Sequence, residues 1–192
     1  MRKVPTRLAA SLLAWAGLGV AAACGGGGEG GSTAEAASAS APAVAVAAEE
    51  DERPIAPDFE LPDLAGKPVT MASLRGKTVV IDFWATWCPP CIFQIPILNS
   101  VQTNHRDAGV VVVGVAVDVE GVEVVKPYAE ENDIQYTVLL GDEGLARKFG
   151  APGFPALVVV SPEGRIDSTH VGLIEEADLN EAIAKVHGDP PS

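Results

Sequence analysis

A Cys-x-x-Cys motif at residues 88–91 directly follows an apolar run at residues 78–84. A nearly continuous apolar run of this length predicts a strand that is covered on both faces of a sheet. Residues 92–102 predict a helix, which places Cys88 at a helix N-terminus. Unpaired N–H groups and the helix dipole favour a thiolate there, and the thiolate is the form that attacks disulfides. The motif therefore predicts redox chemistry, with Cys88 as the nucleophile and Cys91 as the resolving thiol.

Two other uses of a cysteine pair compete with this interpretation. A structural disulfide that closes so short a loop removes little chain entropy, so stability alone gives the pair little reason to exist. A tetrahedral zinc site needs four ligands, and the chain has neither a second Cys-x-x-Cys motif nor a spaced His/Cys pair. We therefore expect no metal at the cysteines and no other cofactor.

The pattern along residues 54–188 predicts a single α/β domain with a mixed sheet, because strands alternate with helices before a final hairpin and helix. Pro96 is expected to kink the helix that follows the cysteines. The strands are predicted at residues 56–62, 69–71, 79–84, 110–117, 135–140, 156–160 and 165–171, and the helices at residues 92–102, 122–131, 143–149 and 175–187. Residues 189–192 are expected to form a short tail.

The N-terminal 23 residues have the pattern of a secretory signal peptide. Three basic residues, Arg2, Lys3 and Arg7, precede an uncharged apolar run at residues 8–23 that is too short for a comfortable membrane span. Small residues lead directly into Cys24, which resembles the lipobox of a bacterial lipoprotein, although Ala21 stands where leucine is usual. We expect lipidation of Cys24 and an anchor on the extracytoplasmic (periplasmic) side of a bacterial membrane. The alternative is a plain signal peptide that is cut nearby.

Residues 24–53 are rich in Gly, Ala and Ser and have almost no large apolar side chain, so they predict a flexible linker. As a random coil, this linker would span on the order of 30 Å. The formal net charge is −13, and it becomes −16 without the leader, which holds three basic and no acidic residues. So acidic a protein is a poor candidate for binding nucleic acid.

Three stretches of the sequence resemble the thioredoxin superfamily. Residues 80–91 with Pro96 resemble its active-site stretch, and residues 149–156 resemble its cis-proline loop. Residues 56–59 and 74–77 are similar to the redoxin branch, which includes the membrane-tethered TlpA/ResA-type thiol–disulfide oxidoreductases. The match implies a thioredoxin-like three-layer α/β/α sandwich with a central mixed sheet, N-terminal short strands and an insert after the second core strand. The insert falls at about residues 118–142.

The resemblance also implies a substrate-binding face beside the cysteines. It assigns Pro155 as a cis-proline opposite them, so that the backbone of Phe154 can pair with an extended substrate segment. Without the cysteines, an ordinary trans turn would be the simpler interpretation of Pro155. Trp87, Pro89 and Pro90 are expected to complete this face.

Asp82 lies six residues before Cys88 in an otherwise apolar strand. Burial there would raise its pKa and let it take the proton of Cys91 during resolution, and thioredoxins carry an aspartate at this position. The alternative is a carboxylate that faces solvent at a strand edge. Several ResA-like proteins carry a glutamate three residues after the second cysteine, where this chain has Gln94, which does not titrate.

Together these features predict an extracytoplasmic thiol–disulfide oxidoreductase that reduces protein disulfides. We expect a monomer that is supplied by an upstream thiol donor in the membrane, with cytochrome c maturation as one pathway. Two alternatives remain open at this stage, a peroxiredoxin-like thiol peroxidase and a Cu(I)-binding metallocentre assembly factor. A third is an inert lipoprotein with a vestigial thioredoxin fold.

Overall fold

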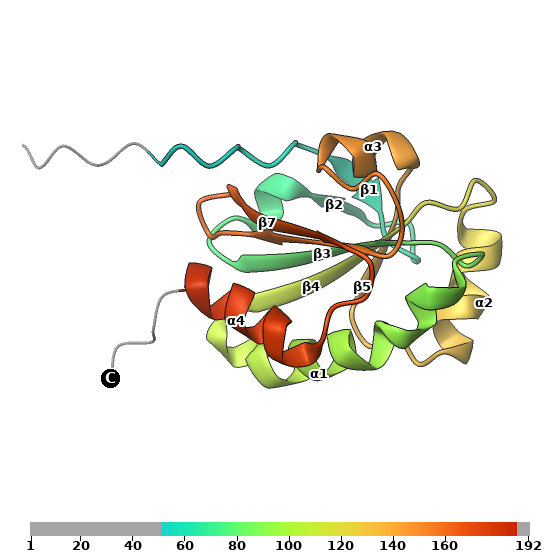
Figure 1. Ribbon diagram of the computed structural model, residues 1–192. Helices are drawn as coiled ribbons and strands as arrows, with labels where there is room; N and C mark the ends of the chain where they lie inside the picture. Colours follow the sequence, from blue (N-terminus) through green and yellow to red (C-terminus); the bar gives the residue numbers. More distant parts are fainter. Residues whose placement is uncertain (1–50, 188–192) are drawn as a thin grey trace, which may run out of the picture. The chain divides into compact units, whose positions relative to one another are not determined.

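The computed structural model describes residues 51–187, so the predicted signal peptide, Cys24, nearly all of the linker and the C-terminal tail lie outside the described residues. Its centre is a five-stranded sheet in the order β5-β4-β3-β6-β7 (Figure 1). Neighbouring strands are parallel from β5 through β4 to β3 and antiparallel from β3 through β6 to β7. The sheet is therefore mixed, as the sequence predicts. Its strands are β3 (Thr78–Trp84), β4 (Val110–Ala116), β5 (Thr137–Leu140), β6 (Ala156–Val160) and β7 (Ile166–Val171).

Layers of helix cover both faces of this sheet (Figure 1). Helices α1 (Ile95–His105) and α4 (Glu176–His187) pack against each other and against one face. The opposite face carries α3 (Glu143–Lys148) and a hairpin of β1 (Glu60–Pro62) and β2 (Pro68–Thr70). All seven residues of β3 are buried, which explains why this strand is apolar along its whole length. The three-layer α/β/α architecture is confirmed.

The predicted insert adds one helix and one strand to the edge of the sheet. Helix α2 (Val122–Glu131) crosses from β4 to β5, and β5 continues the parallel part of the sheet. Asn99 of α1 holds the turn between them, because its Nδ2 donates to Asp133 O at 2.8 Å and its Oδ1 accepts from Gln135 N at 2.9 Å. The insert is thus joined to the helix that follows the cysteines.

The helix after the cysteines differs from the prediction. Residues Pro89–Phe93 form a short 3-10 helix, and the α-helix α1 begins only at Ile95. Pro96 lies in the first turn of α1, where a missing N–H costs nothing, so it starts the helix instead of kinking it. Cys88 is consequently the N-cap residue of a 3-10 helix and not of a long α-helix.

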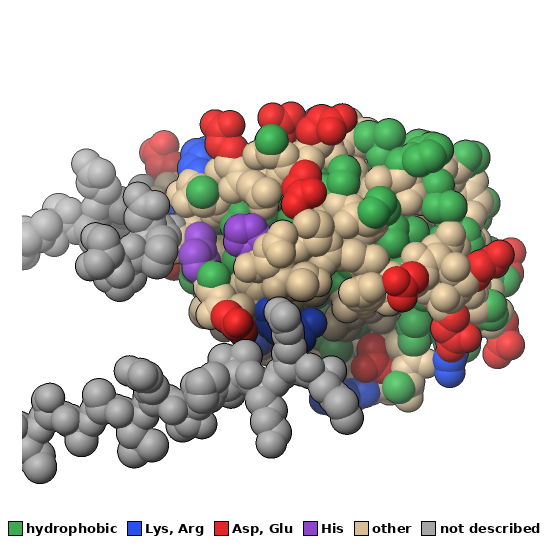
Figure 2. All heavy atoms as spheres, turned by 90° about the horizontal axis from the view of Figure 1, so that it is seen from below, with side chains coloured by type: hydrophobic (Ala, Val, Ile, Leu, Met, Phe, Trp, Pro, Cys, Tyr) green, Lys and Arg blue, Asp and Glu red, His purple; other side chains and the backbone are tan. Residues whose placement is uncertain are grey.

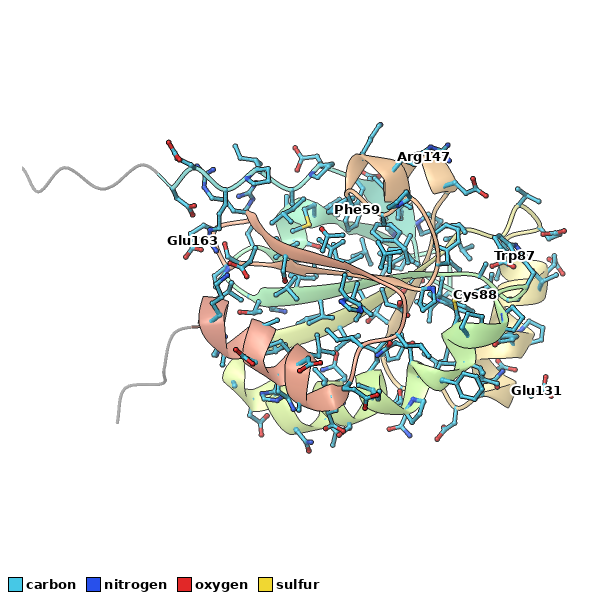
Figure 3. The ribbon with its side chains drawn as sticks, in the orientation of Figure 1. Phe59, Trp87, Cys88, Glu131, Arg147 and Glu163 are labelled. Atoms are coloured by element: carbon cyan, nitrogen blue, oxygen red, sulfur yellow. A yellow bond between two sulfur atoms is a disulfide. The ribbon has the colours of Figure 1, made fainter. Side chains whose placement is uncertain are left out.

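The contacts of the domain begin a little before the predicted start at Pro54. Arg53 Nη1 lies 3.2 Å from Asp167 Oδ1, and Arg165 Nε lies 3.5 Å from Asp51 Oδ2. These ion pairs attach the entering chain to the start of β7, close in sequence to Glu163, which lies at the opposite end of the molecule from Cys88 (Figure 3). None of the helices in the described part of the chain is long and apolar enough to cross a membrane.

Candidate active site

Cys88 and Cys91 form a disulfide at the C-terminal end of β3, with an S–S distance of 2.09 Å and a Cα–Cα distance of 5.5 Å. A tight turn leads out of the strand, because Cys88 N donates to Ala85 O at 3.1 Å. The 3-10 helix follows at once, with Cys91 N donating to Cys88 O at 3.1 Å. Strand, turn and helix therefore hold the two sulfurs at bonding distance.

Both cysteines are buried, but only one of them lines a pocket at the surface. Cys88 lines a pocket of about 390 Å³, whereas Cys91 does not line it and lies deeper in the core. The pocket wall includes four of the residues predicted to bind substrate, together with Arg147 of α3 (Figure 3). These four are Trp87, Pro89, Pro90 and Phe154. Of the two cysteines, Cys88 is therefore the one that a molecule in the pocket can approach.

The Phe154–Pro155 peptide bond is cis, as the resemblance implies for Pro155. The ring of Phe154 meets Trp87 edge-on, with centroids 5.9 Å apart. Trp87 is 58% exposed, whereas Trp84 is buried and stacks on Tyr128 of α2 with centroids 5.4 Å apart. The two tryptophans therefore divide into one surface residue beside the disulfide and one core residue.

Large apolar side chains gather on the surface around the disulfide. Figure 2 shows them at the right-hand end of the molecule, the end at which Figure 3 places Cys88. Ile92 and Phe93 follow Cys91 directly, and Val171 and Leu173 lie at the end of β7 that pairs with the start of β6. Of the large hydrophobic residues exposed in the described part of the chain, Ile55 alone lies at the other end of the sheet. The site is thus the apolar end of an acidic protein.

Asp82 is buried in the middle of β3, between Gly114 of β4 and Leu157 of β6, with an exposed fraction of 2%. The alternative of a solvent-facing carboxylate at a strand edge is therefore wrong. Burial raises the pKa of Asp82 from 3.8 to about 7, because the ionised form loses its hydration. A carboxyl group with this pKa can accept or release a proton near neutral pH.

Asp118 is a part of the site that the sequence analysis missed. It is buried just after β4, and its carboxylate accepts hydrogen bonds from Thr86 Oγ1 at 2.5 Å and from Thr86 N at 3.2 Å. Thr86 belongs to the turn that carries Cys88, so Asp118 holds this turn against the neighbouring strand. Because β3 and β4 are parallel, their carboxyl ends meet at one edge of the sheet, and that rule would have found the pair.

No group of three or more His, Cys, Asp or Glu side chains within residues 51–187 is placed to hold a metal ion. Cys88 and Cys91 are joined by a disulfide. The strand that leads to them carries Asp82, a buried acid whose pKa is about 7. This combination of fold and site defines a thiol–disulfide oxidoreductase of the thioredoxin type.

Comparison with known proteins gives the family. The sequence model of the AhpC/TSA family matches residues 54–169, and the chain belongs to this family. It is 27% identical to the thioredoxin-like protein YneN of Bacillus subtilis over 129 residues, which cover 67% of this chain and 76% of that protein. It is 26% identical to the thiol-disulfide oxidoreductase ResA of Bacillus cereus over 132 residues, 68% of this chain and 76% of ResA.

Solved structures show the same likeness. A thiol:disulfide interchange protein of the thioredoxin family from Chlorobium tepidum superposes with a TM-score of 0.63 at 33% identity, covering 71% of this chain and 97% of that one. The exposed lipoprotein thioredoxin Etrx1 of Streptococcus pneumoniae superposes with a TM-score of 0.61 at 25% identity, covering 67% and 99%. The predicted fold and the predicted oxidoreductase class are both confirmed.

Proposed function

We propose that this chain is an extracytoplasmic reductase of protein disulfides that works through the Cys88/Cys91 dithiol. The observation that carries the proposal is the different placement of the two cysteines, since Cys88 lines the pocket beside Trp87 and Phe154 whereas Cys91 does not. A nucleophile must reach its substrate, whereas a resolving thiol needs to reach only its neighbour.

The reaction balances as two successive thiol–disulfide exchanges. The thiolate of Cys88 attacks one sulfur of the substrate disulfide, forms a mixed disulfide and releases the first substrate thiolate. Cys91 then loses its proton and attacks the sulfur of Cys88, which releases the second substrate thiolate and closes the disulfide between Cys88 and Cys91. The substrate gains two electrons, and an upstream dithiol in the membrane restores them to the enzyme.

Asp82 is the proton acceptor for Cys91 in this scheme. An acceptor works best when its pKa lies near the operating pH, and burial brings that of Asp82 to about 7. Gln94 stands where several ResA-like proteins have glutamate, so within this chain the titrating role falls to Asp82.

The leader and Cys24 support a place in the cell envelope, anchored by lipid. A cytosolic glutathione pool keeps exposed thiols reduced, whereas a signal peptide carries this chain out of the cytosol. One of the similar solved structures is described as an exposed lipoprotein thioredoxin. In that compartment a role in the maturation of cytochrome c is one use of the reductase.

Two competing functions have less support. A thiol peroxidase of the peroxiredoxin kind carries a Pro-x-x-x-Thr/Ser-x-x-Cys pattern, but Ala85 and Ile81 stand where this pattern, read back from Cys88, needs Thr or Ser and Pro. A Cu(I)-binding assembly factor would use the two thiolates, and copper titration of the reduced protein tests it directly.

The test is a trap for the mixed disulfide. Cys91→Ser in the full chain, expressed in its own cell envelope, should retain partner proteins as disulfide adducts of Cys88, because the resolving thiol is gone. The Cys88→Ser/Cys91→Ser double variant is the control and should retain none. A measured potential of roughly −120 mV, that of a strong oxidant, would overturn the direction of the reaction.

A further inference from the structure

Three buried polar atoms near Gly114 have no hydrogen-bond partner in the described structure. They are Asp82 Oδ1, Trp84 Nε1 and the hydroxyl oxygen of Tyr136. Buried polar groups in proteins are nearly always paired, so three such atoms in one region need an explanation. Asp82 is the proton acceptor of the proposed reaction, and the other two are groups that the mechanism has not used.

The strand register brings the three side chains to one face of the sheet. Asp82 and Gly114 are direct partners on the parallel strands β3 and β4, and Trp84 follows Asp82 by two residues on the same face. On the next strand, Val138 of β5 pairs with Gly114. Tyr136 lies two residues before Val138, so its side chain is on the same face of the sheet as residue 114. The three groups therefore converge on the glycine.

Gly114 provides the space in which these groups meet. A Cβ atom at residue 114 would lie 2.8 Å from Cε2 of Tyr136 and 2.9 Å from Nε1 of Trp84, both too close for any side chain. The ring of Tyr136 and the indole of Trp84 thus lie against the backbone of β4 directly beside Asp82. A glycine at this position is what allows the ring of Tyr136 to lie against the strand residue that pairs with Asp82.

Among the described residues, burial alone raises the pKa of Asp82, and no neighbouring charge contributes to the shift. Helix α4 packs on β3 and β6 through buried Leu179 and Ile183, and α1 contributes buried Leu98 and Val101. The titratable groups on this face include Tyr136, whose pKa the charge of Asp82 raises, and Tyr128 of α2, which stacks on Trp84. His187 of α4 also faces β3, but its Nδ1 lies 3.0 Å from Thr78 Oγ1, four residues before Asp82. Tyr136 is neutral at the pH where Asp82 titrates, so it acts on the aspartate through its hydroxyl hydrogen.

We propose that Tyr136 is a positioning residue whose hydroxyl is hydrogen-bonded to the ionised carboxylate of Asp82 through one bridging water molecule. The water accepts from the Tyr136 hydroxyl and from Trp84 Nε1 and donates to Asp82 Oδ1, three atoms that have no direct partner in the described structure. This inference rests on the proposed function, in which Asp82 accepts the proton of Cys91. Tyr136 sets the pH at which that acceptor becomes available.

The direction of the effect follows from the charge. A donor that faces a carboxylate stabilises the ionised form, so it lowers the pKa that burial alone would produce. Loss of the hydroxyl should therefore raise the pH at which Asp82 ionises. A hydrogen bond to a charged group is strong enough to move this midpoint by about one pH unit or more.

The experiment measures the resolution step in the reduced protein. A small aromatic disulfide whose thiolate absorbs visible light is mixed with it in a stopped-flow instrument, and the second thiolate released reports attack by Cys91. The rate of this phase is recorded against pH for the wild type, Tyr136→Phe and Tyr128→Phe. Tyr128→Phe is the matched control, because it removes the same atom from the neighbouring ring that stacks on Trp84.

Tyr136→Phe should raise the pH midpoint of the resolution step by about one unit, whereas Tyr128→Phe should leave it unchanged. In an Asp82→Asn background, Tyr136→Phe should cause no shift, since the acceptor that it acts upon is absent. An unmoved midpoint in Tyr136→Phe, an equal shift in Tyr128→Phe, or a shift that persists without Asp82 overturns the inference. If the wild type never releases a second thiolate, it is the proposed function that fails instead.

Discussion

Gln94 and Ile174 are joined by two hydrogen bonds between a fully buried side chain and the backbone of a distant loop. Ile174 N donates to Gln94 Oε1 at 3.1 Å, and Gln94 Nε2 donates to Ile174 O at 3.4 Å. Gln94 lies between the 3-10 helix of the cysteines and α1, and Ile174 lies just before α4. The amide therefore ties the loop before α4 to the redox motif, and it needs both an acceptor and a donor to do so.

Gln94→Glu should make the stability of the protein depend on pH. Burial raises the pKa of a glutamate above its unfolded value, so the variant is fully stabilised only below the unfolded pKa and loses stability as the pH rises through the folded pKa. The protonated acid can still donate to Ile174 O, but the ionised form cannot. We expect a loss of about 1–3 kcal/mol relative to the wild type between about pH 4 and pH 8, measured by urea unfolding.

Gln102→Glu is the control for this variant. Gln102 is also buried, but its side chain accepts a hydrogen bond, from Val112 N at 2.9 Å. An ionised glutamate at residue 102 can still accept this hydrogen bond, so ionisation there removes no donated hydrogen bond. An equal pH-dependent loss in both variants would show that burial of a carboxylate, and not the lost donor, is responsible.

Asp82 should reduce the stability of the oxidised protein at neutral and higher pH. Its folded pKa of about 7 lies above the ordinary value of 3.8, so its contribution is fully present below about pH 4 and is lost as the pH rises through about 7. The difference corresponds to about 4 kcal/mol once the carboxyl is ionised in both states. We expect Asp82→Asn to remove this dependence, so that its stability relative to the wild type rises between about pH 4 and pH 8.

Urea unfolding of both oxidised proteins at the two pH values checks this expectation. The comparison is made between pH values within each protein, because the new amide adds a pH-independent cost of its own. If the wild type and Asp82→Asn show the same change in unfolding free energy from low to high pH, Asp82 does not carry the effect.

Thr86→Val should destabilise the turn that carries Cys88. The variant keeps the shape of the side chain but removes the 2.5 Å hydrogen bond to the buried carboxylate of Asp118. A hydrogen bond to a charged group contributes about 1.5–3 kcal/mol, and urea unfolding should show a loss of that size. Thr103→Val, on the exposed surface of α1, should cost much less. Equal losses at the two positions would mean that the bond to Asp118 adds nothing.

The sequence predicts most of the fold because its signals are local. Helix α2 has the predicted bounds even though Pro127 lies inside it. Asp142 caps α3 by accepting from Leu145 N at 2.8 Å, as its residue type predicts. The predicted start of α1 at residue 92 was wrong, because proline can have two opposite effects on a helix. Pro96 can kink a helix or begin one, and the choice depends on how the 3-10 turn of the cysteines packs.

The candidate site, like the fold, could be predicted only in part from the sequence. The burial of Asp82 was predictable, because its neighbours in the strand are all apolar. The convergence of Trp84 and Tyr136 on Gly114 was not, because it depends on the register between β3, β4 and β5, and no single stretch of sequence encodes that register. Gly114 interrupts a run of valines in the sequence, and only the structure shows that the rings of Tyr136 and Trp84 occupy the space that a side chain at this position would need.

Trp87→Ala should weaken the recognition of protein substrates without unfolding the domain. Trp87 is 58% exposed and packs edge-on against Phe154 at the pocket beside Cys88, so it has much apolar surface for a partner and little role in the core. An aromatic anchor at the centre of an interface commonly contributes more than 1 kcal/mol, so we expect kcat/KM for a protein disulfide to fall by about tenfold. Reduction of a small disulfide should change less.

Ile55→Ala is the control, because Ile55 is 65% exposed at the other end of the sheet. If both variants lower kcat/KM equally, the apolar surface around the disulfide is not the docking surface.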